Sequence, residues 1–183
     1  MTAAAVTYLE GYLFDQPDAK AAFRHAAGAA HAAGRRVSLS LSDTFCVERH
    51  QRDLLALVEH EVDILFANEA EACALFEVPT LEDAVAAAAR SCEVAIVTQG
   101  AKGSVAVGAD GPVELPVHPV AGGVVDTTGA GDLYASGFLY AFTHGYGLEV
   151  CGRVGALAAS EVIAHIGARP EHSLAELAAP LLR

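Results

Sequence analysis

Short apolar runs and amphipathic stretches alternate along the 183-residue chain. The clearest strand is Val94–Thr98, a continuous run of apolar and β-branched residues, and residues 37–41 alternate apolar and serine positions as a half-buried strand does. Pro17 is expected to open an alanine-rich helix that ends near Gly34. The same reading predicts further strands at residues 4–9, 62–66, 103–107 and 113–117, and further helices at residues 52–60, 68–76, 84–90, 129–142, 148–165 and 173–182.

Strands that alternate with helices predict an α/β protein with a mostly parallel sheet covered on both faces. In such sheets, ligands bind beyond the carboxyl ends of the strands. Asp43 or Thr44 can cap the helix that follows the strand at residues 37–41. Thr80 with Asp83 forms an acidic variant of the capping box. No repeat, low-complexity tract or flexible linker is found, so residues 1–183 are expected to form one domain.

Charge and composition narrow the classes of function. The formal net charge of −12 argues against a broad nucleic-acid or anionic-membrane surface, both of which require lysine and arginine. It does not argue against ATP, because a local cluster of backbone N–H groups can hold phosphate in an acidic protein. No apolar run approaches about twenty residues, and the first residues lack a signal-peptide pattern, so a cytoplasmic protein is expected. The four cysteines form no CxxC pair and the eight histidines no HExxH set, so reduced, mostly buried thiols and no zinc site are expected.

The most informative segment is residues 126–132, where Gly129, Ala130 and Gly131 precede a predicted helix. Small residues let the backbone approach a ligand, and the first N–H groups of a helix are unpaired at the positive end of its dipole. A transferring phosphoryl group fits that place. Asp132, in the first turn, could accept the proton of an attacking hydroxyl. Alone, such a turn is more often a plain helix start whose acidic residue complements the dipole.

The longer pattern decides between these interpretations. Residues 126–139, DTTGAGDLYASGFL, resemble the C-terminal signature of the PfkB (ribokinase-like) kinases at all fourteen positions. The resemblance implies a three-layer α/β/α ribokinase-like fold, ATP and Mg²⁺ as cofactors, and Asp132 as the catalytic base beside the anion hole of Gly129, Ala130 and Gly131. The absence of GxGxxG after the first strand argues against a Rossmann dehydrogenase.

Two further motifs follow in the order that the family has. Residues 68–71, NEAE, resemble its NxxE motif, which implies that Asn68 and Glu71 position Mg²⁺ and phosphate through water. Taken alone, Asn68 would be read as a helix cap. Residues 98–103, TQGAKG, resemble the TxGxxG turn beside the ATP phosphates and ribose, which implies that Thr98, Gly100 and Gly103 contact the nucleotide, although a plain turn would have the same sequence.

The resemblance extends to weaker features. The family implies K⁺ beside the anion hole, at Asp126 and the backbone of Thr128, although Asp126 could equally form an Asx-type turn. Glu10, after the first strand, lies where some ribokinases place a glutamate near the acceptor sugar, although a strand-end carboxylate is more often just solvated. Residues 153–160, RVGALAAS, with Gly167-Ala168, resemble the helix and turn that flank adenine, and their spacing is closer to adenosine kinases. Residues 40–47, SLSDTFCV, are similar to bacterial members of that branch.

Complete members of the family also have earlier strands and a small β lid, neither of which this sequence contains. The resemblance therefore implies a C-terminal fragment, natural or artificial, that turns over poorly or not at all because acceptor positioning and water exclusion are lost. An uncovered sheet edge is expected to favour homo-oligomers. The function expected of the parent enzyme is phosphorylation of a nucleoside or sugar, with adenosine as the first candidate. A ribokinase or fructokinase type of sugar kinase and a non-catalytic nucleotide-binding module remain the alternatives.

Overall fold

The computed structural model describes residues 2–183, which divide into two compact units. The N-terminal unit runs to Gln99 and includes Val107–Pro112, and the C-terminal unit comprises Gly100–Ala106 and Val113–Arg183. Two parts of one domain and two separate domains would both divide in this way, so the single domain over residues 1–183 stays a prediction.

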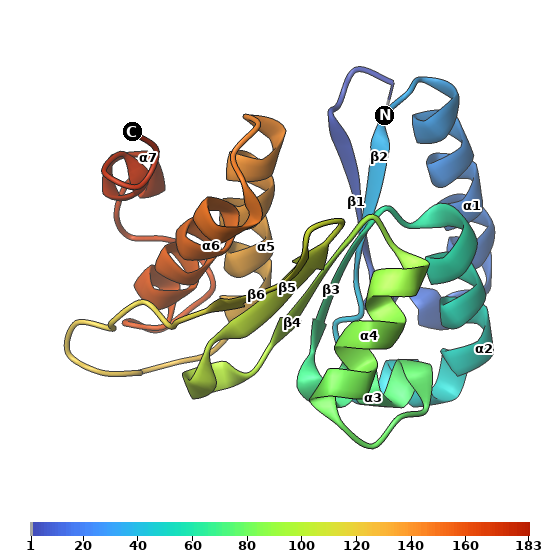
Figure 1. The fold of residues 1–183 in the computed structure, drawn as a ribbon, viewed down its shortest axis with the longest axis horizontal. Coiled ribbons are helices and arrows are strands. Elements are labelled where there is room, and N and C mark those ends of the chain that lie inside the picture. Colours follow the sequence, from blue (N-terminus) through green and yellow to red (C-terminus); the bar gives the residue numbers. More distant parts are fainter. Residues whose placement is uncertain (1) are drawn as a thin grey trace. The chain divides into compact units, whose positions relative to one another are not determined.

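Parallel strands and the helices that follow them make up most of the N-terminal unit (Figure 1). Its elements are β1 (Val6–Glu10), the 3₁₀-helix η1 (Gly11–Asp15), α1 (Pro17–Ala32), β2 (Arg36–Ser40), α2 (Thr44–Glu61), β3 (Ile64–Asn68), α3 (Glu69–Phe76), α4 (Leu81–Ser91) and β4 (Val94–Thr98). β1 pairs with β2, β2 with β3 and β3 with β4, all in parallel. The α/β class with a mostly parallel sheet is thereby confirmed.

The strands of this unit bring their polar terminal residues to one edge. In β3 and β4 four consecutive residues are buried, as in a parallel sheet whose strands are covered on both faces. The register pairs Glu10 with Ser40, and Asn68 with Thr98. Because the carboxyl ends of parallel strands lie together, Glu10, Asn68 and Thr98 all lie at that edge of the sheet.

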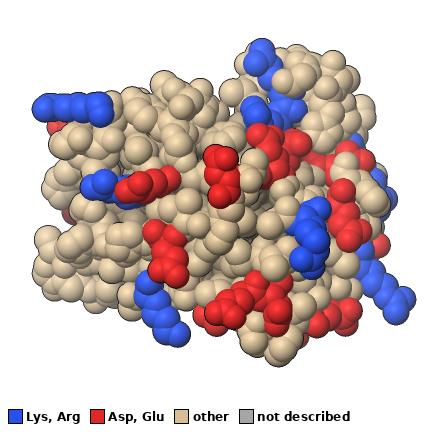
Figure 2. All heavy atoms as spheres, viewed as in Figure 1, with Lys and Arg blue, Asp and Glu red and all other residues tan. Residues whose placement is uncertain are grey.

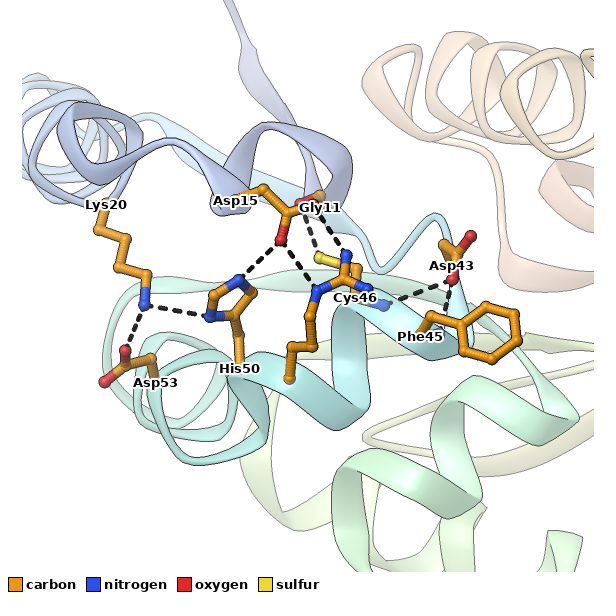
Figure 3. A network of polar contacts seen from close by, with 9 residues as sticks. Gly11, Asp15, Lys20, Asp43, Phe45, Cys46, His50 and Asp53 are labelled. Carbon is orange, nitrogen blue, oxygen red and sulfur yellow. Dashed lines mark hydrogen bonds and ion pairs between the residues drawn. The ribbon is translucent and has the colours of Figure 1, made fainter.

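The start of α2 differs from the prediction. The carboxylate of Asp43 accepts hydrogen bonds from the backbone N–H groups of Phe45 and Cys46, so α2 begins at Thr44 rather than Arg52 (Figure 3). At His50 the backbone leaves helical geometry, with φ −121° and ψ 19°. This kink interrupts the helical periodicity, so the sequence pattern predicted only the part of α2 that follows it.

Polar contacts fix the kink in α2 against the preceding elements (Figure 3). His50 Nε2 lies 2.8 Å from the carboxylate of Asp15, which also accepts a bond from Arg49, and His50 Nδ1 lies 3.2 Å from Lys20 Nζ. Lys20 in turn donates to Asp53 at 2.6 Å. Residues of η1, α1 and α2 therefore share one network, which holds the kinked helix in place.

The C-terminal unit contains three helices, and it shares a hairpin with the N-terminal unit. Its helices are α5 (Ala130–Thr143), α6 (Leu148–Val162) and α7 (Leu174–Ala178), and the shared hairpin is β5 (Ser104–Gly108) with β6 (Gly111–Leu115). The strand order of the sheet is β1-β2-β3-β4-β5-β6. Two helix predictions were too long here, because α6 ends at Val162 rather than at residue 165 and α7 ends at Ala178 rather than at residue 182. Pro180 has no N–H group with which to continue the hydrogen bonds of α7. The strand predicted at residues 113–117 begins two residues earlier, so Gly111 and Pro112 belong to β6.

Small residues let α5 and α6 pack closely. A Cβ atom on Gly137 would lie 2.7 Å from the carbonyl oxygen of Val154, and one on Gly155 would lie 2.8 Å from that of Tyr134. The hydroxyl of Tyr134 is 2.7 Å from that of the buried Ser104. These contacts fix the position of α5, and therefore that of the glycine-rich turn at its N-terminus.

On the face drawn in Figure 2, Lys and Arg side chains are interspersed with Asp and Glu rather than gathered. Within residues 2–183, no helix combines the length and the apolar character needed to cross a bilayer. All four cysteines are free, with Cys46 and Cys151 buried and Cys73 and Cys92 partly exposed.

Candidate functional site

The glycine-rich turn forms the N-terminus of α5. Its two glycines, Gly129 and Gly131, differ in whether the fold requires glycine at their position. Gly129 is the N-cap residue and has left-handed geometry, with φ 79°. A Cβ atom there would lie 2.8 Å from the Cβ atom of Ala168, so the fold itself requires glycine. At Gly131 the backbone is helical, and a Cβ atom would meet nothing within 4 Å. The fold does not require glycine at that position, which leaves an approaching ligand as a reason for it.

The start of α5 offers unpaired donors beside a free carboxylate. Gly129 has no side chain to cap the helix, so the N–H groups of Gly131 and Asp132 have no capping acceptor. These groups lie at the positive end of the helix dipole. Asp132 is exposed, and no hydrogen bond or ion pair within residues 2–183 involves its carboxylate. The arrangement can bind an anion and can offer a base next to it.

Asp126 organises the turn that precedes α5. Its Oδ1 accepts hydrogen bonds from the backbone N–H and hydroxyl of Thr128, at 2.9 and 2.7 Å, and its Oδ2 accepts one from the Gly167 N–H at 3.0 Å. The Thr128 hydroxyl, followed by the N–H groups of Gly167 and Thr128, lowers the pKa of Asp126 to about 2. The Asx-type turn that was one reading of Asp126 is therefore present, and a K⁺ site at Asp126 and Thr128 stays a prediction.

The depressed pKa of Asp126 predicts a stability difference that depends on pH. Because the pKa of Asp126 is about 2 in the folded chain and 3.8 when unperturbed, its contribution is fully present above pH 3.8 and is lost as pH falls through 2. We expect D126N to lower the urea midpoint at pH 6 and the gap from wild type to close towards pH 2. Urea titrations from pH 2 to 6 measure this, with D110N, at the exposed hairpin turn, as control. A gap that does not change with pH would contradict the prediction.

Asn68 and Glu71 form a reciprocal capping box at the start of α3. The Glu71 N–H donates to the Asn68 side chain at 2.9 Å, while the Asn68 N–H and side-chain amide donate to the two Glu71 carboxylate oxygens at 2.8 and 2.7 Å. The cap interpretation of Asn68 is therefore present in the structure. Water-mediated contact with Mg²⁺ stays a prediction.

Glu71 is a buried carboxylate that has no cationic partner among the described residues. Burial raises the pKa of Glu71, the Asn68 N–H lowers it, and the nearby Asp43 raises it again. A cation near this edge of the sheet would relieve both the burial and the repulsion from Asp43. The chemistry of this position therefore suits a hydrated divalent cation.

Thr98 and the turn after it have partly structural roles. Thr98 lies opposite Asn68 in the β3–β4 pair, and its hydroxyl is 3.5 Å from the Ala67 carbonyl oxygen. In the C-terminal unit, Gly100 and Gly103 both have positive φ, and the Gly103 N–H donates to the Gly100 carbonyl at 3.2 Å. A Cβ atom on Gly103 would lie 2.2 Å from the Leu115 carbonyl oxygen, so the fold requires this glycine.

Comparison with known sequences decides the family. The profile described as pfkB family carbohydrate kinase matches residues 1–174, almost the entire chain. The chain belongs to the pfkB family.

Several pfkB-family relatives are close in sequence or structure. The adenosine kinase of Sinorhizobium meliloti is 48% identical with a TM-score of 0.93, and a probable sugar kinase of Rhizobium etli CFN 42 is 46% identical with a TM-score of 0.94. Each comparison covers 98% of this chain and 55% of the other. The nucleoside kinase of Methanocaldococcus jannaschii is 43% identical over 115 residues, 60% of this chain and 35% of the relative. The chain thus spans about half, or less, of the length of these relatives.

Within this pfkB-family chain, the structure brings the predicted residues together in two groups. In the N-terminal unit, Asn68, Glu71 and Thr98 are neighbours, and Glu10 lies at the same sheet edge but belongs to β1, separated from β3 by β2. In the C-terminal unit, the predicted residues around the turn are contiguous; they are Asp126, Thr128, Gly129, Ala130, Gly131 and Asp132.

The contacts of the segment after α6 were not predicted. The Gly167 N–H donates to Asp126, and Ala168 lies against Gly129, so this segment supports the glycine-rich turn directly. The only sequence signal was the Gly167-Ala168 pair itself, which the family resemblance assigns to the surroundings of adenine.

Proposed function

We propose that this chain supplies the phosphate-binding and catalytic part of a kinase that transfers the γ-phosphoryl group of ATP to a nucleoside hydroxyl, with adenosine as the leading acceptor. The observation that carries the proposal is the start of α5, where uncapped N–H groups and the free, exposed carboxylate of Asp132 occupy one helical turn. The S. meliloti adenosine kinase and the M. jannaschii nucleoside kinase support this choice of acceptor.

In the proposed reaction, Asp132 accepts the proton of the acceptor hydroxyl as its oxygen bonds to the γ-phosphorus. The bond from that phosphorus to the β,γ-bridging oxygen breaks, and ADP leaves. The uncapped N–H groups of Gly131 and Asp132 stabilise the negative charge that develops on the transferred group, while Gly129 and Ala130 shape the turn that places them. Because these donors are fixed by α5, they need no rearrangement during the transfer.

The other predicted residues receive roles in the same proposal. Asn68 and Glu71 would hold Mg²⁺ through water, and Asp126 with the Thr128 backbone would hold K⁺. When bound, these ions supply positive charge near the phosphates. Thr98, Gly100 and Gly103 would contact the phosphates and ribose of ATP, and Glu10 would contact the acceptor.

A sugar acceptor is the second candidate, and the probable sugar kinase of R. etli, 46% identical, favours it. A nucleoside presents a base that can be recognised by stacking and hydrogen bonds, whereas a sugar presents hydroxyls alone. The acceptor can therefore be decided by comparing adenosine, cytidine, ribose and fructose directly.

The test is ADP formation by the 183-residue chain with MgATP and KCl and each of these four acceptors, with a reaction lacking acceptor as control. Mass spectrometry of the product identifies the phosphorylated compound. We expect slow transfer, in keeping with the fragment that the sequence predicts, with adenosine phosphorylated above the other three acceptors. Binding of MgATP in calorimetry without transfer to any acceptor would favour the non-catalytic module, and no binding of MgATP would overturn the proposal.

A further inference from the structure

The C-terminal unit contains a buried carboxylate for which the proposed reaction has no use. Glu161, near the end of α6, is only 9% exposed. Its Oε1 accepts hydrogen bonds from the N–H groups of Glu171 and His172, both at 2.9 Å, and lies 3.1 Å from His172 Nδ1. Its Oε2 faces Nε2 of His165 at 3.6 Å. A single carboxylate therefore contacts three residues of the segment that follows α6.

Glu161 is held in its ionised form by these donors. Burial alone would raise the pKa of Glu161, but the N–H and ring of His172, the Glu171 N–H and the His165 ring together lower that pKa below its ordinary value. Hydrogen bonds to an ionised acceptor are stronger than neutral ones. The charge of Glu161 thus strengthens its hold on this segment.

The segment of residues 163–172, called here the C-terminal loop, also contacts the glycine-rich turn. The Ile163 carbonyl accepts a hydrogen bond from the Val125 N–H at 2.8 Å. The Gly167 N–H donates to Asp126, and Ala168 occupies the space beside Gly129. The middle of the loop therefore supports the turn, while Glu161 holds the loop's far end.

The C-terminal loop has no regular secondary structure to hold its shape. Residues 163–172 contain neither helix nor strand. Without Glu161, the N–H groups of Glu171 and His172 would lose their acceptor, and the far end of the loop would lose the side chain that anchors it to α6. The position of Gly167 and Ala168 would then depend on the contacts with the turn alone.

We propose that Glu161 is a positioning residue for phosphate binding: by anchoring the C-terminal loop, it fixes Gly167 and Ala168, and through them Asp126 and Gly129. The inference rests on the proposed function, because positioning for phosphate binding requires that ATP binds at this turn. The geometry connects Glu161 to the anion-binding N–H groups without any contact between Glu161 and the ligand.

The test compares E161Q with E149Q, whose substituted residue is exposed in the first turn of the same helix. Amide hydrogen exchange is measured by NMR in the absence of nucleotide. In E161Q we expect about tenfold faster exchange at Glu171 and His172, and also at Gly167 and Thr128, whose N–H groups donate to Asp126. We also expect the Kd for MgATP to rise about threefold to thirtyfold. E149Q should behave like wild type in both measurements.

The outcomes separate this inference from the proposed function. If Gly167 and Thr128 exchange at wild-type rates in a folded E161Q, the positioning role is wrong, whereas the proposed function is unaffected. If these amides exchange faster but neither protein binds MgATP, the link from Glu161 to the turn is supported and the proposed function fails. If E161Q does not fold, the wild-type protein alone provides the test. Because coupling between two sites is reciprocal, MgATP must slow amide exchange at Glu171 and His172. Unchanged exchange at these amides would overturn the positioning role of Glu161.

Discussion

Replacing Asp132 by asparagine is expected to lower the rate of phosphoryl transfer by about 10²- to 10⁴-fold, the usual contribution of a general base. Asparagine has nearly the same shape but cannot accept the proton of the acceptor hydroxyl. Because Asp132 is exposed and makes no polar contact in the described chain, D132N should keep the wild-type thermal midpoint. MgATP should bind as well or slightly better, since a negative charge next to the phosphates is removed.

The measurements for D132N are ADP release with saturating acceptor, MgATP affinity by calorimetry, and thermal unfolding. D110N serves as the matched control, because Asp110 is an exposed aspartate in the hairpin turn between β5 and β6. Turnover within a factor of two of wild type would remove Asp132 from the role of base. An equal loss in D132N and D110N would point to a general effect of charge rather than to proton transfer.

Much of the fold was predictable where one physical cause dominates a segment. β4 matches its prediction at both ends, because Val94–Thr98 is a continuous buried run with polar residues on either side. The start of α3 was predictable from Asn68, since the side chain that caps the helix lies in the sequence immediately before it. In these segments local propensity and tertiary burial favour the same structure.

The misplaced segments are those in which distant contacts override the local pattern. The kink at His50 depends on Asp15 and Lys20, which belong to other elements, so the sequence around α2 could not indicate it. The same applies to the candidate site. The turn at residues 126–132 was identified from its own sequence, whereas its support by Gly167, Ala168 and Glu161 arises only when the loop after α6 folds back.

The capping box illustrates why geometry alone does not assign a role. Asn68 and Glu71 fully satisfy each other as a helix cap, and the same two side chains are the proposed Mg²⁺ contacts. The two roles are compatible, because a carboxylate oxygen that accepts one hydrogen bond still has a lone pair for a water molecule of the ion's shell. The burial of Glu71 without a cationic partner favours the additional role over a cap alone.

The two glycines of the turn allow packing and ligand binding to be separated. In G129A, a residue with φ 79° would carry a Cβ atom 2.8 Å from Ala168, so we expect a loss of about 2–5 kcal/mol from left-handed strain and overlap together. In G131A the added methyl group meets no protein atom within 4 Å, and alanine is the better helix former. G131A should therefore be at least as stable as wild type.

The affinity of G131A for MgATP, unlike its stability, should be lower than that of wild type. If phosphate oxygens approach the backbone at Gly131, the methyl group of G131A must displace them, and an overlap of about 1–3 kcal/mol corresponds to roughly a 5- to 150-fold weaker Kd. Calorimetry with MgATP and urea unfolding measure the two effects in the same protein. G28A is the matched control, because Gly28 lies within α1 and a Cβ atom there also meets nothing within 4 Å. Since the fold gives no reason for glycine at position 131, wild-type affinity in G131A would mean that no phosphate approaches the start of α5 closely, and the proposed site would lose its central argument.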